Sequence, residues 1–127
     1  MTVDEIYSIT KIIMFEKPSS TIYDNYLIHN LNRVLYELFE ENNNERIWNG
    51  KAPLTERMTV STRQDDVPYE DIYCQQIIPL GLATYFEIDD DLAKYNLYNT
   101  DYQNARIINQ RLISQEMLDA VNTDTNI

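Results

Sequence analysis

The chain has few of the residues on which small catalytic and metal-binding domains depend. Its 127 residues include one cysteine, one histidine, one tryptophan and two glycines. A single Cys74 excludes a disulfide framework and a multi-cysteine metal site within the chain. So little glycine is unusual for an enzyme with tight active-site turns and suits a helical protein. No glycine-rich phosphate loop and no Gly-x-Ser-x-Gly motif occurs.

Long apolar runs and basic residues are also scarce. No apolar run approaches the 18 residues of a membrane span, and the first residues lack the features of a signal peptide, so we expect no membrane association. Ten Lys and Arg residues stand against 21 Asp and Glu residues, which gives a formal net charge of −11. A surface this acidic repels phosphates, so we expect no high-affinity binding of nucleic acid by a basic patch.

What is present predicts one folded helical domain. The length is that of a single domain, and 43% hydrophobic residues with ten tyrosines argue against a disordered chain. Apolar residues recur at spacings of three and four, which is typical of helices, in four stretches: 2–15, 21–41, 69–88 and 90–118. We therefore expect a mainly α fold, a small bundle of about four helices over residues 1–113, in which the second and fourth helices are the longest.

Three local signals add detail to these helices. Thr2 and Glu5 have the spacing of a capping box at the start of the first helix. Pro79 and Gly81 lie inside the third stretch and predict a kink or a helix in two pieces. The acidic run 89–91 lacks the glycine and glutamate of a calcium-binding loop, and it is better interpreted as the capping turn of the last helix.

Two segments lack regular apolar periodicity. The three asparagines 42–44 are predicted to end the second helix and to open a long loop over residues 42–68, in which two short pieces around Asn49-Gly50 could pair as a β-hairpin. Residues 114–127 are predicted to form an extended C-terminal tail.

Neither segment is expected to be held by its own domain, so both are expected to order against a partner. Trp48 is expected to be the main anchor, because tryptophan is enriched among interface hot spots. The expected partner-binding residues are Ile47, Trp48, Leu54, Met58 and Val60 in the loop, and Met117, Leu118 and Ile127 in the tail.

The residues give no support for catalysis. His29 is the only histidine and lies mid-helix without a second histidine or cysteine nearby, so we interpret it as a structural or surface residue. Cys74 lies beside Tyr73 on an apolar stretch and is interpreted as a small buried hydrophobe. We therefore expect no catalytic residues, no metal and no cofactor. A metal-dependent enzyme would require His29, Cys74 or several carboxylates to cluster in the fold.

Four segments carry a resemblance to a known family. They are residues 26–35 of the second helix, Val67-Pro68-Tyr69-Glu70-Asp71-Ile72, the Pro79-x-Gly81-x-Ala83 step within 78–86, and Asp101-Tyr102-Gln103-Asn104-Ala105. Over roughly residues 20–113 the chain is similar to the head-to-tail adaptor, or connector, proteins of tailed bacteriophages. The resemblance implies a helical virion protein, made in the bacterial host cytoplasm, that forms a ring of twelve copies in the neck, between the portal protein and the tail or further neck proteins. DNA would pass through its central channel without specific binding.

A different class of function also fits the composition. A free acidic inhibitor or DNA mimic presents carboxylates at phosphate-like spacing to a basic partner, and such a protein needs no catalysis either. The two hypotheses differ in partner, since an adaptor binds copies of itself and the portal, whereas a mimic binds a nucleic-acid-binding protein.

Overall fold

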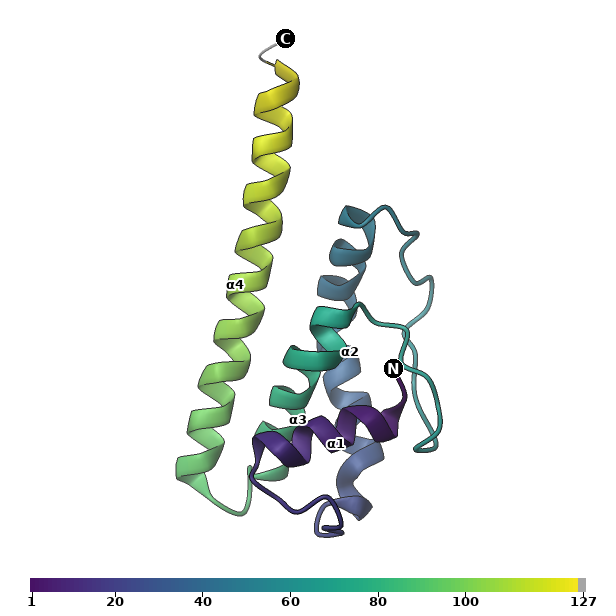
Figure 1. Cartoon of the computed structure of the whole chain (residues 1–127), viewed down its shortest axis with the longest axis vertical. Helices are drawn as coiled ribbons and strands as arrows, with labels where there is room; N and C mark the ends of the chain where they lie inside the picture. Colours follow the sequence, from purple (N-terminus) through teal and green to yellow (C-terminus); the bar gives the residue numbers. More distant parts are fainter. Residues whose placement is uncertain (126–127) are drawn as a thin grey trace.

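Helices account for most of the chain in the computed structural model (Figure 1). The structure describes the backbone of residues 1–125 and the side chains of all of these except 117 and 120–125. Over this range the elements are α1 (Val3–Ile13), the 3-10 turn η1 (Asp24–Tyr26), α2 (Leu27–Trp48), the π-helical turn η2 (Tyr73–Ile77), α3 (Ile78–Phe86) and α4 (Leu92–Thr125). The predicted bundle of four α-helices is confirmed, and α2 and α4 are the longest, with 22 and 34 residues.

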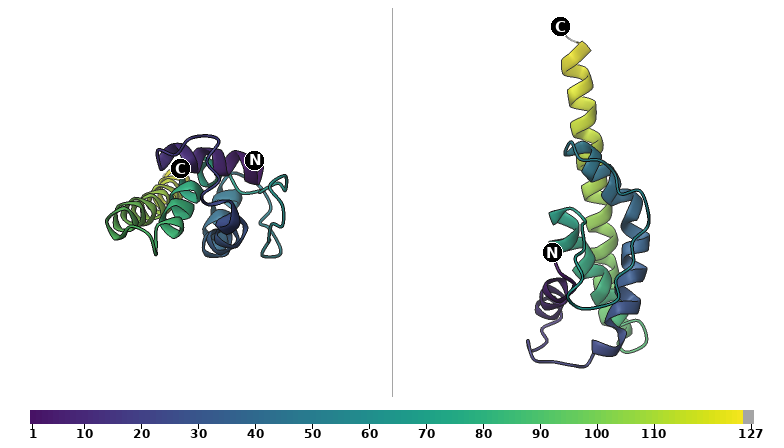
Figure 2. Two further views of the ribbon diagram at one scale, coloured as in Figure 1. Left: turned by 90° about the horizontal axis from the view of Figure 1, so that it is seen from below. Right: turned by 90° about the vertical axis from the view of Figure 1, so that its right-hand side faces the viewer.

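The short helix α3 lies at the centre, with α1, α2 and α4 around it (Figures 1 and 2). Nearly all of its side chains are apolar, so a position in contact with three other helices removes most of them from water. The surrounding helices contribute their apolar stripes to this core: Val3, Ile6 and Tyr7 from α1, Leu27, Leu31, Val34, Leu35 and Leu38 from α2, and Tyr98 and Tyr102 from α4.

Gly81 lies where side chains of both α2 and α4 pack against α3. A Cβ atom placed on Gly81 would lie 3.0 Å from the ring of Tyr102 and 3.1 Å from a methyl group of Val34. Both neighbours are completely buried. A residue without a side chain is therefore what allows α4 to pack this closely against the central helix.

The predicted break near Pro79 is present as a change of helix type. The N–H of Ile78 donates to the carbonyl of Tyr73, five residues back, so the chain makes a π turn before α3 begins. Pro79 occupies the first turn of α3, where its missing N–H removes no bond that an α-helix needs. The third helical stretch is thus in two pieces, as predicted.

Helix α1 begins as predicted and ends unusually. The Oγ1 atom of Thr2 accepts from the N–H of Glu5 at 3.2 Å, and the Glu5 carboxylate accepts from the N–H of Thr2 at 3.3 Å, which confirms the capping box. At the other end Phe15 has φ of 57° in the left-handed region, and the N–H of Glu16 donates to the carbonyl of Lys11 at 2.9 Å. Glycine usually occupies such a position.

The prediction that the three asparagines end the second helix is wrong. α2 continues through them to Trp48, because asparagine side chains on this helix bond to the following loop and leave the backbone of their own helix intact. The side chain of Asn43 makes two hydrogen bonds to the backbone of Leu54, of 2.8 and 3.1 Å, and Asn42 accepts from the N–H of Glu70 at 2.8 Å. Asn32, three turns earlier, binds the backbone of Val60 in the same two-bond manner.

The predicted β-hairpin is also absent. Residues 1–125 contain only an isolated bridge between Thr2 and Asp66, and no strand. Asn49-Gly50 instead forms the end of α2, where Gly50 has φ of 79° and the N–H of Lys51 donates to the carbonyl of Arg46 at 2.8 Å. Backbone groups of Leu54 and Val60 in the loop form hydrogen bonds with asparagine side chains of α2 instead of with a strand.

The expectation that the domain does not hold this loop is wrong as well. Val60 is only 2% exposed and belongs to the core, and Leu54 and Met58 pack against the core. The end of the loop is bonded to the start of the chain: the N–H of Val3 donates to the carbonyl of Asp65 at 3.0 Å, and Val67 donates to the carbonyl of Met1 at 2.8 Å. Residues 49–68 are therefore an ordered part of the bundle.

The C-terminal segment projects as a tail, but it is helical. α4 continues past Ser114 to Thr125 and extends well beyond the end of α2 (Figures 1 and 2). Among the described side chains of α4, Ile113 is the last that is buried. The remaining residues, Asn126 and Ile127, lie outside the described part of the chain.

Candidate interaction surfaces

The predicted partner-binding residues that the structure describes fall into two groups, those buried in the domain and those on its surface. Leu54, Met58 and Val60 are used by the core of the domain itself. Ile47 is 53% exposed and Trp48 is half-buried, at the C-terminal end of α2. In the tail Leu118 is 54% exposed on α4, whereas the side chain of Met117 and all of Ile127 lie outside the described residues. The surface anchors that remain are therefore Ile47, Trp48 and Leu118.

The reactive side chains lie apart from one another. His29 is exposed on α2, and Cys74 is buried with its Sγ atom 3.4 Å from the carbonyl oxygen of Tyr69. Burial raises the pKa of the Cys74 thiol to about 11, which keeps it protonated and unreactive at neutral pH. Among the described residues no three side chains of His, Cys, Asp or Glu come together as metal ligands would. The described helices also include none with the length and apolar character of a membrane span.

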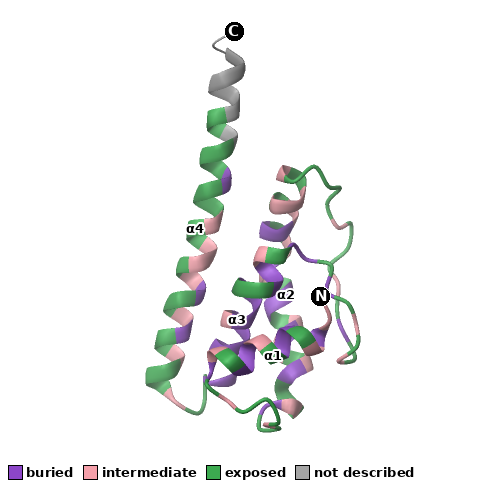
Figure 3. Cartoon of the chain, viewed as in Figure 1, coloured by how far each residue is buried: buried purple, intermediate pink, exposed green. Residues whose placement is uncertain are grey.

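α4 carries apolar side chains around most of its circumference. On its inner side Tyr98 and Tyr102 belong to the core, and Ile113 is buried further along the helix. The same 3–4 spacing also predicts Ile108 and Leu112 on this side, but both are more than half exposed. The outer face is left in solvent, as the green and pink stretches of α4 in Figure 3 show. Its large apolar side chains are 43–71% exposed: Leu92, Leu97, Ile107, Ile108, Leu112 and Leu118. Within the described part of one copy nothing covers these apolar side chains, so the outer face of α4 is a candidate contact surface.

A polar layer attaches the inner face of α4 to α2. The guanidinium of Arg106 donates to the Glu41 carboxylate at 2.6 and 2.9 Å. Glu37, one turn earlier on α2, accepts from the hydroxyl groups of Tyr102 and Tyr85. Burial raises the pKa of Tyr85 to about 12, and the bond to Glu37 adds to this effect. The two carboxylates are thus occupied within the bundle.

Beyond this layer α4 has progressively less to pack against. The amide of Asn109 donates to the hydroxyl of Tyr73 at 3.2 Å, and Ile113 is the last buried side chain among those described. Arg111 lies in the same turns but is exposed, and it makes no hydrogen bond or ion pair with any described residue. A short helix without packing is only marginally stable in water, so a projecting helix end is a second sign of a missing neighbour.

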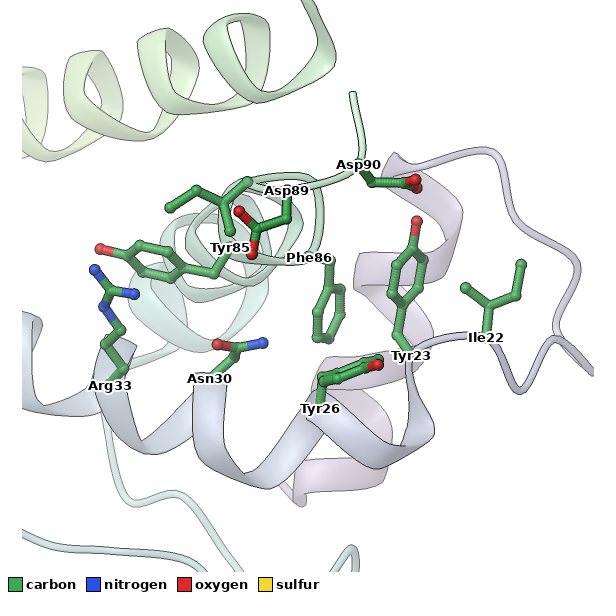
Figure 4. A pocket seen from close by; sticks show the side chains of 10 residues that line it. Ile22, Tyr23, Tyr26, Asn30, Arg33, Tyr85, Phe86, Asp89 and Asp90 are labelled. Atoms are coloured by element: carbon green, nitrogen blue, oxygen red, sulfur yellow. The ribbon is translucent and has the colours of Figure 1, made fainter. Parts of the chain in front are cut away.

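The opposite end of the bundle contains a pocket. It lies between the start of α2 and the end of α3 and has a volume of about 530 Å³ (Figure 4). Phe86 forms its centre and stacks on Tyr23, with ring centroids 4.6 Å apart and the planes 7° from parallel. Tyr85 forms the far wall, where the guanidinium of Arg33 lies 4.0 Å from the centre of its ring. The other lining residues are Ile22, Tyr26, Asn30, Ile88, Asp89 and Asp90.

The open side of this pocket, named here the end pocket, is acidic. Asp89 and Asp90 lie on the connection between α3 and α4 and are exposed. Their carboxylates make no hydrogen bond or ion pair with the described residues, whereas the neighbouring Asp91 caps α4 by accepting from the N–H of Lys94 at 3.1 Å. The predicted capping role of the acidic run thus belongs to Asp91, and two carboxylates remain beside aromatic rings.

Further apolar side chains are exposed at the same end of the bundle. They come from the end of α1 and from the two connections that meet there: Ile12, Phe15, Ile22, Tyr26, Ile88 and Leu92. Phe15 is 94% exposed and occupies the left-handed backbone region, where a bulky side chain is strained. Packing does not explain backbone strain at a residue whose side chain is exposed, so Phe15 is a candidate for a role in binding.

The sequence did not reveal these two surfaces. Leu97, Ile108 and Leu112 lie within a helix that was correctly predicted, but a helix with apolar residues around most of its circumference gives no indication of which side is covered. The end pocket joins residues 22–33 to residues 85–90, and no local pattern connects these segments. The acidic run 89–91 was the one visible signal.

Comparisons with known proteins identify no similar protein. No family model matches the chain, no curated protein matches it, and no solved structure matches it.

Proposed function

We propose that this chain is a structural subunit of a bacteriophage neck: a head-to-tail adaptor that assembles as a ring on the portal and surrounds the DNA channel. The proposal rests on the resemblance of four sequence segments to that family and on surfaces of the bundle that have no partner within one copy. It assigns the chain no catalytic role.

The segments that carry the resemblance belong to one packing unit. Gly81, from the proline-glycine-alanine step, lies in α3, and Tyr102, from the last segment, lies in α4 directly against it. Residues 26–35 supply Leu27, Leu31 and Val34 to the same core. A shared core supports a common origin for these motifs more strongly than scattered positions would.

The observation that carries the proposal is the outer face of α4. Six large apolar side chains are exposed along this helix, and its last turns extend beyond the rest of the bundle. Burial of such surface against a neighbouring copy is favourable by roughly 25 cal/mol per Å². A ring is the natural closed arrangement for a subunit that uses two different surfaces to contact its two neighbours.

The alternative, a free acidic inhibitor or DNA mimic, is less well supported. A mimic needs carboxylates that are open to a partner, but several here bind cations of their own chain. Asp4 and Asp24 lie 2.7 and 3.6 Å from Arg63, and Glu70 lies 2.9 Å from Lys51. Glu37 and Glu41 are likewise bound to Arg106, so these five carboxylates are not open to a basic partner. In a ring, carboxylates that face the channel would repel the phosphates of passing DNA.

Assembly can be tested with the purified chain and a portal protein of a tailed bacteriophage. We expect analytical ultracentrifugation and electron microscopy to detect a ring of several copies on the portal. Serine at both Ile108 and Leu112 should abolish the ring without changing the helix content, whereas Gln110→Ser, on the same turns, should leave it intact. A chain that stays monomeric with the portal, and that binds a basic nucleic-acid-binding protein with steep salt dependence, would establish the mimic instead.

A further inference from the structure

Two charged features at opposite ends of the molecule lack partners. Asp89 and Asp90 face the end pocket, and Arg111 lies on an exposed side of α4, two residues before the last buried side chain described, Ile113. None of the three side chains makes an ion pair or hydrogen bond with a described residue. Twenty-one residues of helix and turn separate Asp90 from Arg111, which is about 30 Å at 1.5 Å per residue. One copy cannot bring them together.

The end pocket has the chemistry of a site for a cation on an apolar stem. The faces of Tyr26 and Phe86 offer a surface on which a guanidinium can stack, and the two carboxylates can accept its N–H groups. A volume of about 530 Å³ holds one long side chain together with part of an apolar neighbour. The acidic rim disfavours an anionic occupant.

Few cations of this chain are free to enter such a pocket. Most arginines and several lysines are bound within the bundle, to carboxylates, to backbone carbonyls or over aromatic rings. Among the cations that make no such contact with described residues, Lys17 and Lys94 belong to the same end as the pocket, on the connection after α1 and in the first turn of α4. Arg111 is the one at the far end.

The surroundings of Arg111 complement the pocket. Ile107 and Ile108 precede it by one turn, Leu112 follows it, and all three are exposed by 43–58%. A guanidinium flanked by branched aliphatic side chains matches a pocket whose aromatic floor and Ile22 and Ile88 are apolar and whose rim carries two carboxylates. Charge and apolar surface are thus complementary between the two ends of the molecule.

We propose that Arg111 of one copy, with Ile107, Ile108 and Leu112 around it, occupies the end pocket of the next copy, where its guanidinium pairs with Asp89 and Asp90. This inference rests on the proposed function and names the contact between neighbouring subunits. The contact is heterologous, because each copy uses its α4 toward one neighbour and its end pocket toward the other. Repetition of such a contact closes a ring when the subunits are suitably inclined.

Charge reversal tests the pairing. Arg111→Glu, or Asp89→Lys with Asp90→Lys, should each weaken self-association by about tenfold or more, because like charges then meet in a desolvated contact. All three changes in one chain should restore association. Lys17→Glu and the pair Asp71→Lys with Asp101→Lys make the same changes of net charge at exposed positions that do not line the pocket, and they should have little effect. Circular dichroism should show the same helix content in every variant, since all these side chains are exposed.

A mixing experiment distinguishes this contact from a symmetric one. Arg111→Gln retains a working pocket, and Asp89→Asn with Asp90→Asn retains a working Arg111. An equimolar mixture should therefore form a heterodimer and stop there, whereas either variant alone should remain monomeric. Rings that survive both sets of charge changes would overturn this contact and leave the adaptor proposal standing. A wild-type chain that stays monomeric with the portal would overturn both.

Discussion

Asn32 makes both of its amide hydrogen bonds to a single residue of the loop. Its Oδ1 atom accepts from the N–H of Val60 at 2.7 Å, and its Nδ2 group donates to the carbonyl of Val60 at 3.0 Å. A side chain on a helix thus takes the place of a neighbouring strand, and it allows a buried residue to lie in an irregular loop without unpaired backbone groups.

Loss of this pair should destabilise the whole bundle. Asn32→Ala leaves the N–H and carbonyl of Val60 unsatisfied, and we expect the free energy of unfolding in urea to fall by about 1–3 kcal/mol. Asn104→Ala is the matched control, because Asn104 is exposed on α4 and makes no hydrogen bond to a described residue. Equal stability of the two variants would show that Val60 does not depend on Asn32.

Gly81→Ala should also destabilise the bundle, although alanine is the better helix former. The new methyl group would lie 3.0 Å from the ring of Tyr102, which is buried and has no room to move. We expect a loss of about 1–3 kcal/mol, typical of overpacking, in thermal or urea unfolding. Val34→Ala in the same chain should recover part of that loss by opening space on the other side. A stabilised Gly81→Ala variant would mean that α4 packs less closely than the structure indicates.

Relief of strain at Phe15 should stabilise the monomer. Asparagine tolerates the left-handed region better than other residues with a side chain, and 94% exposure of Phe15 means that its removal loses little packing. We expect Phe15→Asn to be about 1 kcal/mol more stable than Phe15→Ala, which removes the ring but keeps the strain. Urea unfolding of the two variants measures the difference, and equal values would place Phe15 outside the left-handed region in solution.

Buried tyrosines should make the fold sensitive to alkali. Burial raises the pKa of Tyr7, Tyr23, Tyr69, Tyr73 and Tyr102, and it raises the pKa of Tyr85 to about 12. The unfolded chain ionises its tyrosines near pH 10 and then holds fewer protons than the folded chain. The contribution of these tyrosines to the free energy of unfolding should therefore be constant below about pH 10 and fall as the pH rises from there through 12.

Ultraviolet titration of the phenolate, with circular dichroism in parallel, measures this effect. The buried tyrosines should ionise only as helix content is lost, while all ten should titrate together near about pH 10 in concentrated urea. Complete ionisation near pH 10 in a chain that is still helical would contradict the burial of these rings.

The helices could be predicted because their signals are local. Thr2 and Glu5, three residues apart, specify the start of α1. Pro79 predicts the break before α3 because proline lacks the N–H that an uninterrupted helix would need. The end of α2 could not be predicted in this way. Asparagines 42–44 are poor helix residues by themselves, and only their bonds to Leu54 and Glu70, formed by the tertiary fold, allow the helix to continue.

The loop and the pocket show the same limit. The sequence predicts that Val60 and Trp48 both bind a partner, because both lie in a segment without periodicity. In the structure Val60 is buried in the core and Trp48 is the last residue of α2. Burial of an isolated apolar residue in a loop depends on what lies opposite, here Asn32, and composition carries no information about this. The end pocket depends in turn on how α2 and α3 meet.

The two asparagine pairs leave the loop only a few ångströms of slack. From Asn32 to Asn43 the helix advances about 16 Å, at 1.5 Å per residue. The six residue steps from Leu54 to Val60 cover at most about 20 Å when fully extended. Removal of two residues between the pairs would leave a reach of about 13 Å and would release one of them, whereas inserted residues could bulge into solvent. The loop from Leu54 to Val60 therefore has a length that matches three turns of α2. Its length is more strongly constrained by the fold than the identity of most of its residues.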